Sequence, residues 1–574
     1  MRMTALLAML VTPGLALGQD ALPMGQLGTE LDGNVEIPTL GTSDGETIYC
    51  VYSNKTQSVW IQSTSDAGAT WSEPVKVMDL VRPLYVTDAN IIVDGDRITV
   101  TATHALVFAT KSVIRRAVSE DAGLTWEEVT PIPVQRNYIC GMIHAPIWTG
   151  GDRVILGYSW DVPAEEGKAA KGEGGMFLKS GVLISEDRGR TWEPGEDVET
   201  DVYPIGADEP AIAALSNGDI FMVLRTGGPR PYETVSHDAG VTWEKPVPSE
   251  FNANNSPTAL LRLADGGIVR SWDNSPNSRF PLVVSISDDD CETWSPPRII
   301  TEPKAVESGG LTYETACYPS LAEAADGTIL MAWWQRAAGG NSVHYARLTR
   351  EWIEEARNMP QPRNIVAFGD SVTKGVRAGV NEYQTFRHLL QEDLKTRGLD
   401  VKVVNAGVGG HNTAMGLARI DADVIENQPE LVIVMFGVND AAMVDGGPVA
   451  RTEPRVSLAD YVANLREIVR RCREAGASVV LCTPSPMSRA YAYSHIGAYA
   501  ENEDMNYQVR VYAQAVRDLA EELDAPLVDA FELFDGRDDG LELIEDGCHP
   551  YVEGHRIIAD AMLEPVAKML TSEE

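Results

Sequence analysis

Residues 365–371 read Ile-Val-Ala-Phe-Gly-Asp-Ser, an apolar strand pattern that ends in a turn of small residues. Ser371 stands at the end of this strand, where the open sheets of α/β proteins carry their chemistry. Gly, Asp and Ser are common turn residues, so the stretch is a weak signal by itself. It gains meaning only if a base, an orienting carboxylate and oxyanion donors follow it along the chain.

The chain from residue 364 onward alternates strand patterns with amphipathic helix patterns, which predicts a parallel sheet in an α/β three-layer, flavodoxin-like domain. We expect five strands, at 364–368, 400–405, 431–436, 478–483 and 526–529. We expect five helices, near 382–396, 412–426, 457–475, 503–523 and 553–570.

Polar residues follow several of these strands in a fixed order. After Ser371 come Asn-Ala-Gly-Val-Gly-Gly-His-Asn-Thr at 405–413, Gly-Val-Asn-Asp at 437–440 and Asp-Gly-Cys-His-Pro at 546–550. Together these four blocks resemble those of the SGNH (GDSL-type) esterase/lipase family, and the resemblance covers residues 364 to about 570. It implies a serine hydrolase that needs no cofactor and no metal.

The residue types in the blocks suit acyl transfer. A serine hydroxyl becomes a good nucleophile when a neutral imidazole takes its proton, as His549 can do for Ser371. Asp546, three residues before the histidine, can hold the imidazole in the required tautomer. The resemblance assigns the oxyanion hole to the backbone N–H groups of Ser371 and Gly410 and to the side-chain amide of Asn439. Gly409 is the alternative to Gly410 in this loop.

Other polar residues near the blocks have simpler explanations. Asp370 and Asp440 are expected to brace their turns. His411 lies on the glycine-rich loop and His555 on the last expected helix, so neither is expected to be the base. Cys548 lies between Asp546 and the expected base, and its side chain is expected to point away from the reaction.

The first three-fifths of the chain repeats one phrase, Ser/Thr-x-Asp-x-Gly-x-Thr-Trp, five times. Its aspartates, at positions 66, 121, 187, 238 and 289, are 55, 66, 51 and 51 residues apart. The fifth copy has Cys291 in place of glycine. In such a turn the carboxylate accepts backbone N–H groups, the glycine allows an unusual backbone conformation and the tryptophan packs on the hairpin. We therefore expect these aspartates to be structural.

A period near 50 residues with short strands between the copies predicts a β-propeller. The phrase resembles the Asp-box of the sialidase-like (BNR-repeat) propellers, over residues 34 to 352, and about 320 residues correspond to six blades. The predicted fold is therefore an all-β six-bladed propeller followed by the α/β domain.

Four residues resemble working residues of sialidases, which hold a substrate carboxylate with three arginines and attack with a tyrosine. Glu209 resembles the glutamate that activates the tyrosine, Arg225 and Arg279 resemble the second and third arginines, and Tyr318 resembles the nucleophile. The first arginine is replaced by Glu36, which repels a substrate carboxylate. Three interpretations of the propeller stay open: a glycan-binding platform, a hydrolase for another sugar, or a sialidase.

Composition sets outer limits. The chain has 574 residues and a net charge of −37, from 47 basic and 84 acidic residues, which argues against a nucleic-acid partner. An apolar run from Met3 to Leu17 after Arg2 predicts a signal peptide at 1–18, cleaved near Gly18, and no membrane insertion of the mature chain. We expect the propeller at 19–350, a linker at 351–363 and the esterase domain at 364–574.

These observations predict a secreted or periplasmic serine esterase that removes acyl groups, above all acetyl, from a glycan or polysaccharide bound or processed by the propeller. The alternatives are a bifunctional glycosidase and esterase, a lipase or lysophospholipase, and a glycan-binding protein with a vestigial hydrolase domain. The oligomeric state is not predicted from the sequence.

Overall fold

A computed structural model describes residues 22–571 of the chain except for 30, 32–34, 55–57, 80–84, 108–110, 135, 137, 162–176, 203–204, 276–277, 304–312, 314, 378, 446 and 545. The expected signal peptide at 1–18 lies outside the described residues. Internal contacts divide the chain into two units, Met1–Met359 and Pro360–Glu574, which are treated separately below.

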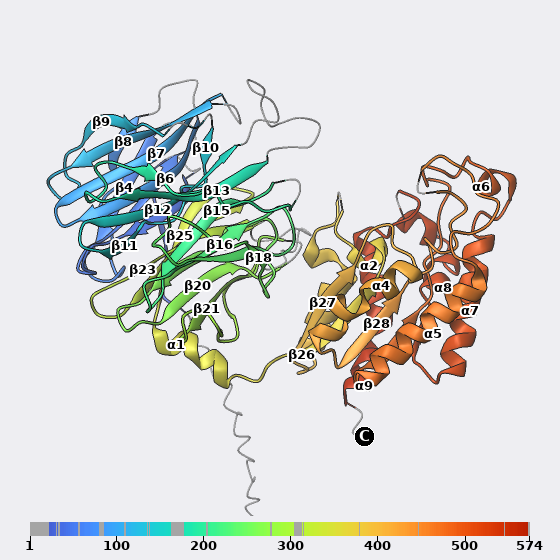
Figure 1. The fold of residues 1–574 in the computed structure, drawn as a ribbon. Coiled ribbons are helices and arrows are strands. Elements are labelled where there is room, and N and C mark those ends of the chain that lie inside the picture. Colours follow the sequence, from blue (N-terminus) through green and yellow to red (C-terminus); the bar gives the residue numbers. More distant parts are fainter. Residues whose placement is uncertain are drawn as a thin grey trace, which may run out of the picture. The chain divides into compact units, whose positions relative to one another are not determined.

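The first unit is a six-bladed β-propeller, as predicted, and each blade is a sheet of antiparallel strands (Figure 1). Blade one contains β2 (Val35–Gly41), β3 (Ile48–Asn54), β4 (Ser58–Thr64) and β5 (Val75–Asp79). Blade two contains β6 (Tyr85–Asp94), β7 (Arg97–Val107), β8 (Lys111–Ser119) and β9 (Glu127–Ile132). Blade three contains β10 (Ile139–Cys140), β11 (Ile147–Gly150), β12 (Arg153–Asp161), β13 (Leu178–Ser185) and β14 (Glu193–Pro194). Blade four contains β15 (Asp208–Ala214), β16 (Ile220–Arg225), β17 (Tyr232–Ser236) and β18 (Val247–Pro248). Blade five contains β19 (Ala259–Arg262), β20 (Ile268–Asp273), β21 (Leu282–Ser287) and β22 (Arg298–Thr301). Blade six contains β23 (Thr315–Glu323), β24 (Ile329–Ala337), β25 (Gly340–Leu348) and β1 (Met24–Leu27).

The ring of blades closes on a strand from the beginning of the chain. β1 pairs antiparallel with β25, with Met24 opposite Ala346 and Leu27 opposite Val343. The sixth blade therefore takes three strands from the end of the unit and one from its start. This pairing ties the two ends of the propeller together. The unit ends in α1 (Arg350–Glu354) and a 3₁₀ turn at Glu355–Asn358.

The Asp-box phrase forms the expected turn. In the third copy, one oxygen of Asp187 accepts the N–H of Thr191 at 2.7 Å, and the other accepts the hydroxyl of the same threonine at 2.7 Å. Gly189 has φ +82°, in the left-handed region that glycine adopts without strain. In the fifth copy Cys291 takes this position with φ +73°. The structural role predicted for these aspartates is confirmed.

The second unit is built on a five-stranded parallel sheet, as predicted, in the order β27-β26-β28-β29-β30. Its strands are β26 (Arg363–Gly369), β27 (Val401–Gly407), β28 (Leu431–Met435), β29 (Ser478–Cys482) and β30 (Leu527–Val528). Its helices are α2 (Ser371–Lys374), α3 (Phe386–Thr396), α4 (Thr413–Asp423), α5 (Leu458–Glu474), α6 (Ala498–Glu501), α7 (Tyr507–Glu522), α8 (Ala530–Asp535) and α9 (Val552–Thr571). The short helices α2, α6 and α8 are additional to the five predicted.

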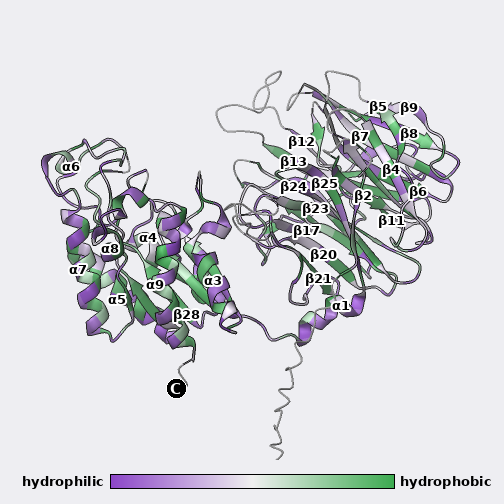
Figure 2. Cartoon of the chain, turned by 180° about the vertical axis from the view of Figure 1, so that it is seen from behind, coloured by the Kyte–Doolittle hydropathy of each residue, from purple (hydrophilic) through white to green (hydrophobic). Residues whose placement is uncertain are grey.

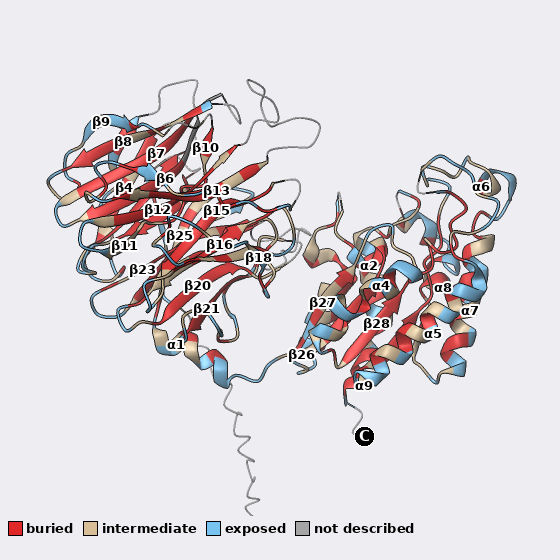
Figure 3. Cartoon of the chain, viewed as in Figure 1, coloured by how far each residue is buried: buried red, intermediate tan, exposed pale blue. Residues whose placement is uncertain are grey.

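Helices cover both faces of this sheet, which makes three layers. α3 and α9 pack on one face, and α4, α5 and α7 pack on the other (Figure 1). Alternate residues of β26 serve the two cores: Ile365 and Ala367 face α3 and α9, and Val366 and Phe368 face the opposite side. The strands are buried while the helices expose their outer sides (Figure 3), and hydropathy divides in the same way (Figure 2).

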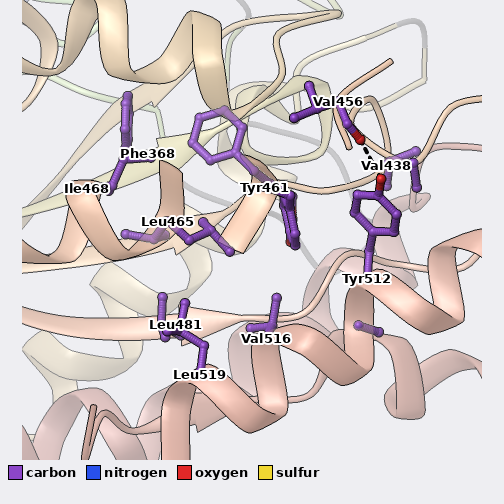
Figure 4. Close-up of a cluster of buried hydrophobic side chains, with 14 of the residues drawn as sticks. Phe368, Val438, Val456, Tyr461, Leu465, Ile468, Leu481, Tyr512, Val516 and Leu519 are labelled. Atoms are coloured by element: carbon purple, nitrogen blue, oxygen red, sulfur yellow. Dashed lines mark hydrogen bonds between the residues drawn. The ribbon is translucent and has the colours of Figure 1, made fainter. Parts of the chain in front are cut away.

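The core under α5 and α7 holds the segment that leads into α5. Tyr461 and Tyr512, with ring centroids 4.9 Å apart, pack there with Leu465 and Val516 (Figure 4). The hydroxyl of Tyr512 donates a hydrogen bond to the carbonyl of Val456. Residues just before α5 are thus fixed to the core by both packing and a hydrogen bond.

The described helices include none that is long and apolar enough to cross a membrane. All seven cysteines lie in the described part of the chain, and all are unpaired. The sequence alone did not predict whether any of these cysteines form disulfide bonds.

Candidate active site

Ser371 lies at the first position of α2, separated by one residue from β26, the strand next to the edge strand β27. Asp370 caps this helix, because its carboxylate accepts the N–H of Val372 at 2.9 Å. β26 lies between β27 and β28, whose connections leave in opposite directions, so the serine lies at the switch point where open sheets form their clefts. The order of the strands, together with the cap, places the hydroxyl at the carboxyl edge of the sheet.

The structure brings His549 and Asp546 to this serine. Nε2 of His549 lies 2.8 Å from Oγ of Ser371, and Nδ1 of His549 lies 2.8 Å from Oδ2 of Asp546. The other carboxylate oxygen, Oδ1, accepts the N–H of His549 at 2.8 Å and that of Cys548 at 3.0 Å. The guanidinium of Arg377 lies 3.3 Å from Oδ2. Four groups therefore hold the carboxylate, and the carboxylate holds the imidazole.

The electrostatics of Asp546 agree with this geometry. Burial raises the pKa of the carboxyl, but hydrogen bonds from the side chain and backbone of His549 and from the backbone of Cys548 outweigh burial and bring the pKa below its usual range. A carboxylate that stays ionised can accept the Nδ1 proton of the imidazole over a wide pH range. Nε2 is then left to accept the proton of Ser371.

Two loops beside Ser371 carry the expected oxyanion donors. A Cβ on Gly409 would lie 3.9 Å from the Cβ of Ser371, so this loop runs directly past the serine. Gly410 follows with φ +78°, a left-handed conformation that disfavours other residues. The side-chain amide of Asn439, after β28, donates one hydrogen bond to the carbonyl of His411 at 3.1 Å, which links the two loops.

Asp440 braces these loops, as predicted. Its Oδ1 accepts the N–H of Thr413 at 3.0 Å and the hydroxyl of Thr413 at 2.5 Å. Burial raises the pKa of Asp440 to about 6. Burial also raises the pKa of Asp370 to about 7, and the nearby charge of Asp440 adds to the shift. A buried carboxyl group therefore lies next to each of two candidate site residues: Asp370 precedes Ser371, and Asp440 follows Asn439.

The remaining candidates take structural positions. Nδ1 of His411 accepts from Arg419 at 3.2 Å, and Nδ1 of His555 accepts the N–H of Phe386 at 3.3 Å inside the core. Burial raises the pKa of the Cys548 thiol to about 12, and this side chain packs against the hydrophobic core. These side chains are engaged away from the proton path between serine and aspartate.

In the propeller the structure brings Glu209, Arg225 and Tyr318 together. Arg225 donates to Oε2 of Glu209 at 2.6 Å and to the hydroxyl of Tyr318 at 3.3 Å. The Tyr318 hydroxyl donates to Oε1 of Glu209 at 3.1 Å. Burial raises the pKa of Tyr318, with a further contribution from Glu209, so the phenol is neutral. The three side chains form a closed hydrogen-bonded cluster in which Glu209 is buried and Arg225 and Tyr318 are partly exposed.

Bulges in the blades' first strands aim these side chains. The register of β15 against β16 shifts between Asp208 and Ala211, and that of β23 against β24 shifts between Cys317 and Ser320. Inside these bulges Glu209 has φ +43° and Tyr318 has φ +57°. Left-handed backbone at residues other than glycine is strained, and bulges re-aim side chains, so these two positions turn Glu209 and Tyr318 out of the strand register. The first strands of blades one and two carry the same bulge, with Ile37 at φ +48° and Asp88 at φ +58°.

The other two propeller candidates lie differently. Arg279 donates to the carbonyl of Asn255 at 2.6 Å and lies 5.6 Å from the ring centre of Tyr318. Glu36 is buried on β2 and accepts a hydrogen bond from Asn341 of β25. The acidic residue at the first-arginine position is thus fixed in the fold.

Several residues of the two sites were not predicted from the sequence. Asn255 accepts from Nε of Arg225 at 2.8 Å, and Asp208 lies 3.8 Å from the same guanidinium. Burial raises the pKa of Asp208 to about 7, with a further contribution from Glu209. Asp208 could have been predicted from the sequence as a site residue, because it directly precedes Glu209. Arg377 and Arg455, the latter 3.4 Å from Oδ1 of Asn439, lie outside every motif and carry no such signal.

Comparisons with known proteins agree with both folds. Residues 367–557 match the family model described as GDSL-like Lipase/Acylhydrolase family, and residues 58–331 match the BNR repeat-like domain. The uncharacterized lipoprotein YqeF of Bacillus subtilis (strain 168) is 30% identical over 219 residues, which cover 35% of this chain and 87% of that protein.

Two further proteins are similar to the separate units. The acetylxylan esterase of Geobacillus stearothermophilus is 30% identical over 171 residues, which cover 29% of this chain and 73% of the esterase. A solved structure of a mutant NanB sialidase from Streptococcus pneumoniae is 14% identical, with a TM-score of 0.46, and the alignment covers 59% of this chain and 72% of the sialidase.

The parallel sheet, the order of the four blocks and these matches lead to one assignment. The C-terminal unit is an esterase/acylhydrolase domain, and the N-terminal unit is a six-bladed propeller with a BNR repeat-like domain. The chain belongs to the GDSL-like lipase/acylhydrolase family.

Proposed function

We propose that the protein is an exported serine esterase that removes acyl groups, above all acetyl groups, from a carbohydrate. The observation that carries the proposal is the unbroken path Ser371 Oγ to His549 Nε2, 2.8 Å, and His549 Nδ1 to Asp546 Oδ2, 2.8 Å. Nucleophile, base and orienting carboxylate within hydrogen-bond reach are what acyl transfer through an activated serine requires.

In the first half of the reaction, Oγ of Ser371 attacks the ester carbonyl carbon while Nε2 of His549 takes the hydroxyl proton. The negative oxygen that forms is held by the backbone N–H groups of Ser371 and Gly410 and by the amide of Asn439. The bond to the sugar oxygen then breaks, and His549 returns the proton to that oxygen. The acyl group is now an ester of Ser371, and the sugar leaves as an alcohol.

In the second half, water attacks the acyl-enzyme carbonyl and gives a proton to His549. The same three donors hold the second oxyanion. When this intermediate collapses, the proton passes to Oγ of Ser371 and the carboxylic acid leaves. Asp546 stays ionised throughout and stabilises the imidazolium, in agreement with its lowered pKa.

Carbohydrate is the substrate class because two observations point the same way. One similar protein carries the name acetylxylan esterase. The second is the propeller's partly exposed cluster of Glu209, Arg225 and Tyr318, whose charged and hydroxyl groups suit the hydroxyl groups of a sugar. A propeller that binds glycan on the same chain raises the effective concentration of ester near Ser371.

The test is acetate release from acetylated xylan and from p-nitrophenyl acetate. We expect Ser371→Ala to lose both activities, and Ser216→Ala, on the propeller surface, to keep them. Equal rates for Ser371→Ala and the unmodified protein would rule the proposal out. Export predicts that the mature protein begins near residue 19, which mass spectrometry of the protein from the producing cell would show.

A second candidate function is glycosidase activity of the propeller, favoured by the contacts among Glu209, Arg225 and Tyr318. It predicts sugar release that persists in Ser371→Ala and disappears in Tyr318→Phe or Glu209→Gln. A panel of sialosides and uronides without turnover would leave the propeller as a binding platform.

A further inference from the structure

One arginine outside the four sequence blocks contacts the amide assigned to the oxyanion hole. Nη1 of Arg455 donates to Oδ1 of Asn439 at 3.4 Å, and Nε of the same guanidinium donates to the carbonyl of Val444 at 2.7 Å. Two bonds from adjacent nitrogens fix the plane of the guanidinium. The guanidinium of Arg455 is therefore fixed to the loop after β28 and contacts the oxygen of the Asn439 amide.

The backbone around Arg455 is held equally firmly. Its N–H donates to the carbonyl of Ala442 at 3.2 Å, and the N–H of Val456 donates to the carbonyl of Asp440 at 3.1 Å. Val456 is buried, and its own carbonyl accepts the hydroxyl of Tyr512 (Figure 4). The arginine thus pairs with the loop that carries Asn439, and the hydrophobic core holds both.

These contacts distinguish the two ways in which the Asn439 amide can face. In the observed orientation Oδ1 meets the guanidinium, one N–H meets the carbonyl of His411 at 3.1 Å, and the second N–H is left for the oxyanion. A flipped amide would place its N–H₂ against a cationic donor and its oxygen against the His411 carbonyl. It would also present a lone pair, instead of a proton, to the negative oxygen of the intermediate.

We propose that Arg455 is a positioning residue for ester hydrolysis: it locks the amide of Asn439 with an N–H directed at the oxyanion. Its positive charge also polarises the amide, which makes the remaining N–H a stronger donor. The inference rests on the proposed oxyanion role of Asn439. It adds a residue that neither the sequence blocks nor the nucleophile relay includes.

The decisive measurement is a double-mutant cycle on kcat and KM for p-nitrophenyl acetate with the full-length protein. Asn439→Ala alone is expected to lower kcat by about 10²- to 10³-fold, the usual effect of losing an oxyanion donor. Arg455→Met alone is expected to lower kcat by about 10- to 100-fold with little change in KM, because the ground-state ester makes weaker use of the amide. Once Asn439→Ala is present, Arg455→Met is expected to cost less than about 2-fold, because no amide remains to be oriented.

Arg455→Lys keeps the positive charge, so it is expected to recover part of the kcat that Arg455→Met loses. The recovery should be incomplete, because a lysine cannot bind Asn439 and Val444 with a rigid fork. The matched control is Arg473→Met at the other end of α5, whose guanidinium also binds a backbone carbonyl, that of Leu523 at 2.9 Å. This control should leave kcat unchanged. Circular dichroism of each variant identifies any loss of folding, and Arg455→Lys then carries the test.

Each outcome has one meaning. Equal losses from Arg455→Met with and without Asn439→Ala would show a general structural role and overturn the proposal, as would a kcat unchanged by Arg455→Met. Full activity in Asn439→Ala would instead remove the oxyanion assignment from the proposed function. Loss of activity in Ser371→Ala together with normal kcat in Arg455→Met would overturn the positioning role alone.

Discussion

The two candidate sites of this chain are built in opposite ways. In the C-terminal unit, His549 lies within hydrogen-bond reach of Ser371, and Asp546, which binds the imidazole, is itself held by four groups. In the propeller, Glu209, Arg225 and Tyr318 contact one another, but the first-arginine position holds Glu36. A complete constellation predicts chemistry, whereas an incomplete one in the same protein predicts recognition.

The backbone shows a further difference between the sites. The propeller aims Glu209 and Tyr318 by strained left-handed conformations at bulges. The hydrolase aims Ser371 by a strand that ends in a capped helix. Strain has to be held by the surrounding blade, while a cap lowers the free energy of the helix start by itself.

The largest expected effect tests whether ester hydrolysis belongs to the C-terminal unit and glycan binding to the propeller. Ser371→Ala should lower kcat/KM for ester hydrolysis by about 10⁴-fold or more, because the nucleophile is lost. Glycan binding by the propeller, measured by calorimetry with the acetylated and the deacetylated polysaccharide, should not change. A variant that loses glycan binding together with esterase activity would contradict the division.

The next effect concerns the buried carboxyl beside the nucleophile. With its pKa raised to about 7 by burial, Asp370 holds its proton in the folded protein at a pH where the unfolded chain has released it, above about 4. The free energy of unfolding should therefore fall as the pH rises from about 4 to 7, by about 3 kcal/mol from this group.

Asp370→Asn carries no proton to release and can still cap α2. Its unfolding free energy should fall less over the same pH window, as measured by denaturant unfolding of the C-terminal unit's transition in the full chain. An identical pH dependence in both proteins would mean that Asp370 titrates as an ordinary carboxyl.

A smaller effect is expected in the propeller cluster. Tyr318→Phe removes the hydroxyl that bonds to Glu209 and Arg225 and, in the proposed function, to the glycan. Glycan affinity should fall by about 10-fold, which corresponds to the loss of one charge-assisted hydrogen bond to the sugar. Calorimetry on Ser371→Ala with and without the second change measures it. In the protein that keeps Ser371, Tyr318→Phe should leave hydrolysis of p-nitrophenyl acetate unchanged, and a fall there would couple the two sites.

The smallest effect separates structural from functional aspartates. Asp187→Ala removes the acceptor for Thr191 and Ser185 in the third Asp-box, and should lower the stability of the propeller by about 1 kcal/mol. Thermal unfolding would show this loss of stability, and ester hydrolysis and glycan binding should both remain. A loss of glycan binding without a loss of stability would give this turn a functional role.

Sequence patterns predicted much of both units, because their signals are local. The period of the Asp-box phrase predicted six blades, and the alternation of strand and helix patterns predicted the parallel sheet. The residues of the Ser371, Asn439 and His549 blocks could be identified because their types and order along the chain resemble those of the SGNH (GDSL-type) family. Helix starts were harder to predict: the expected helix at 503–523 begins at Tyr507, and short helices such as α8 have too few residues for a period.

The sequence by itself predicted the candidate nucleophile and its relay, through the resemblance of the four blocks to a known family, and it predicted the structural role of the Asp-box, because the phrase repeats. The tertiary structure brought His549 to Ser371, from which it is 178 residues distant in the chain. The tertiary structure alone decided the closure of the ring by β1, the joining of Asn255 to Arg225 and the contact of Arg455 with Asn439. These pairs come from different elements, and no local propensity links them. Only packing in three dimensions determines which side chains meet.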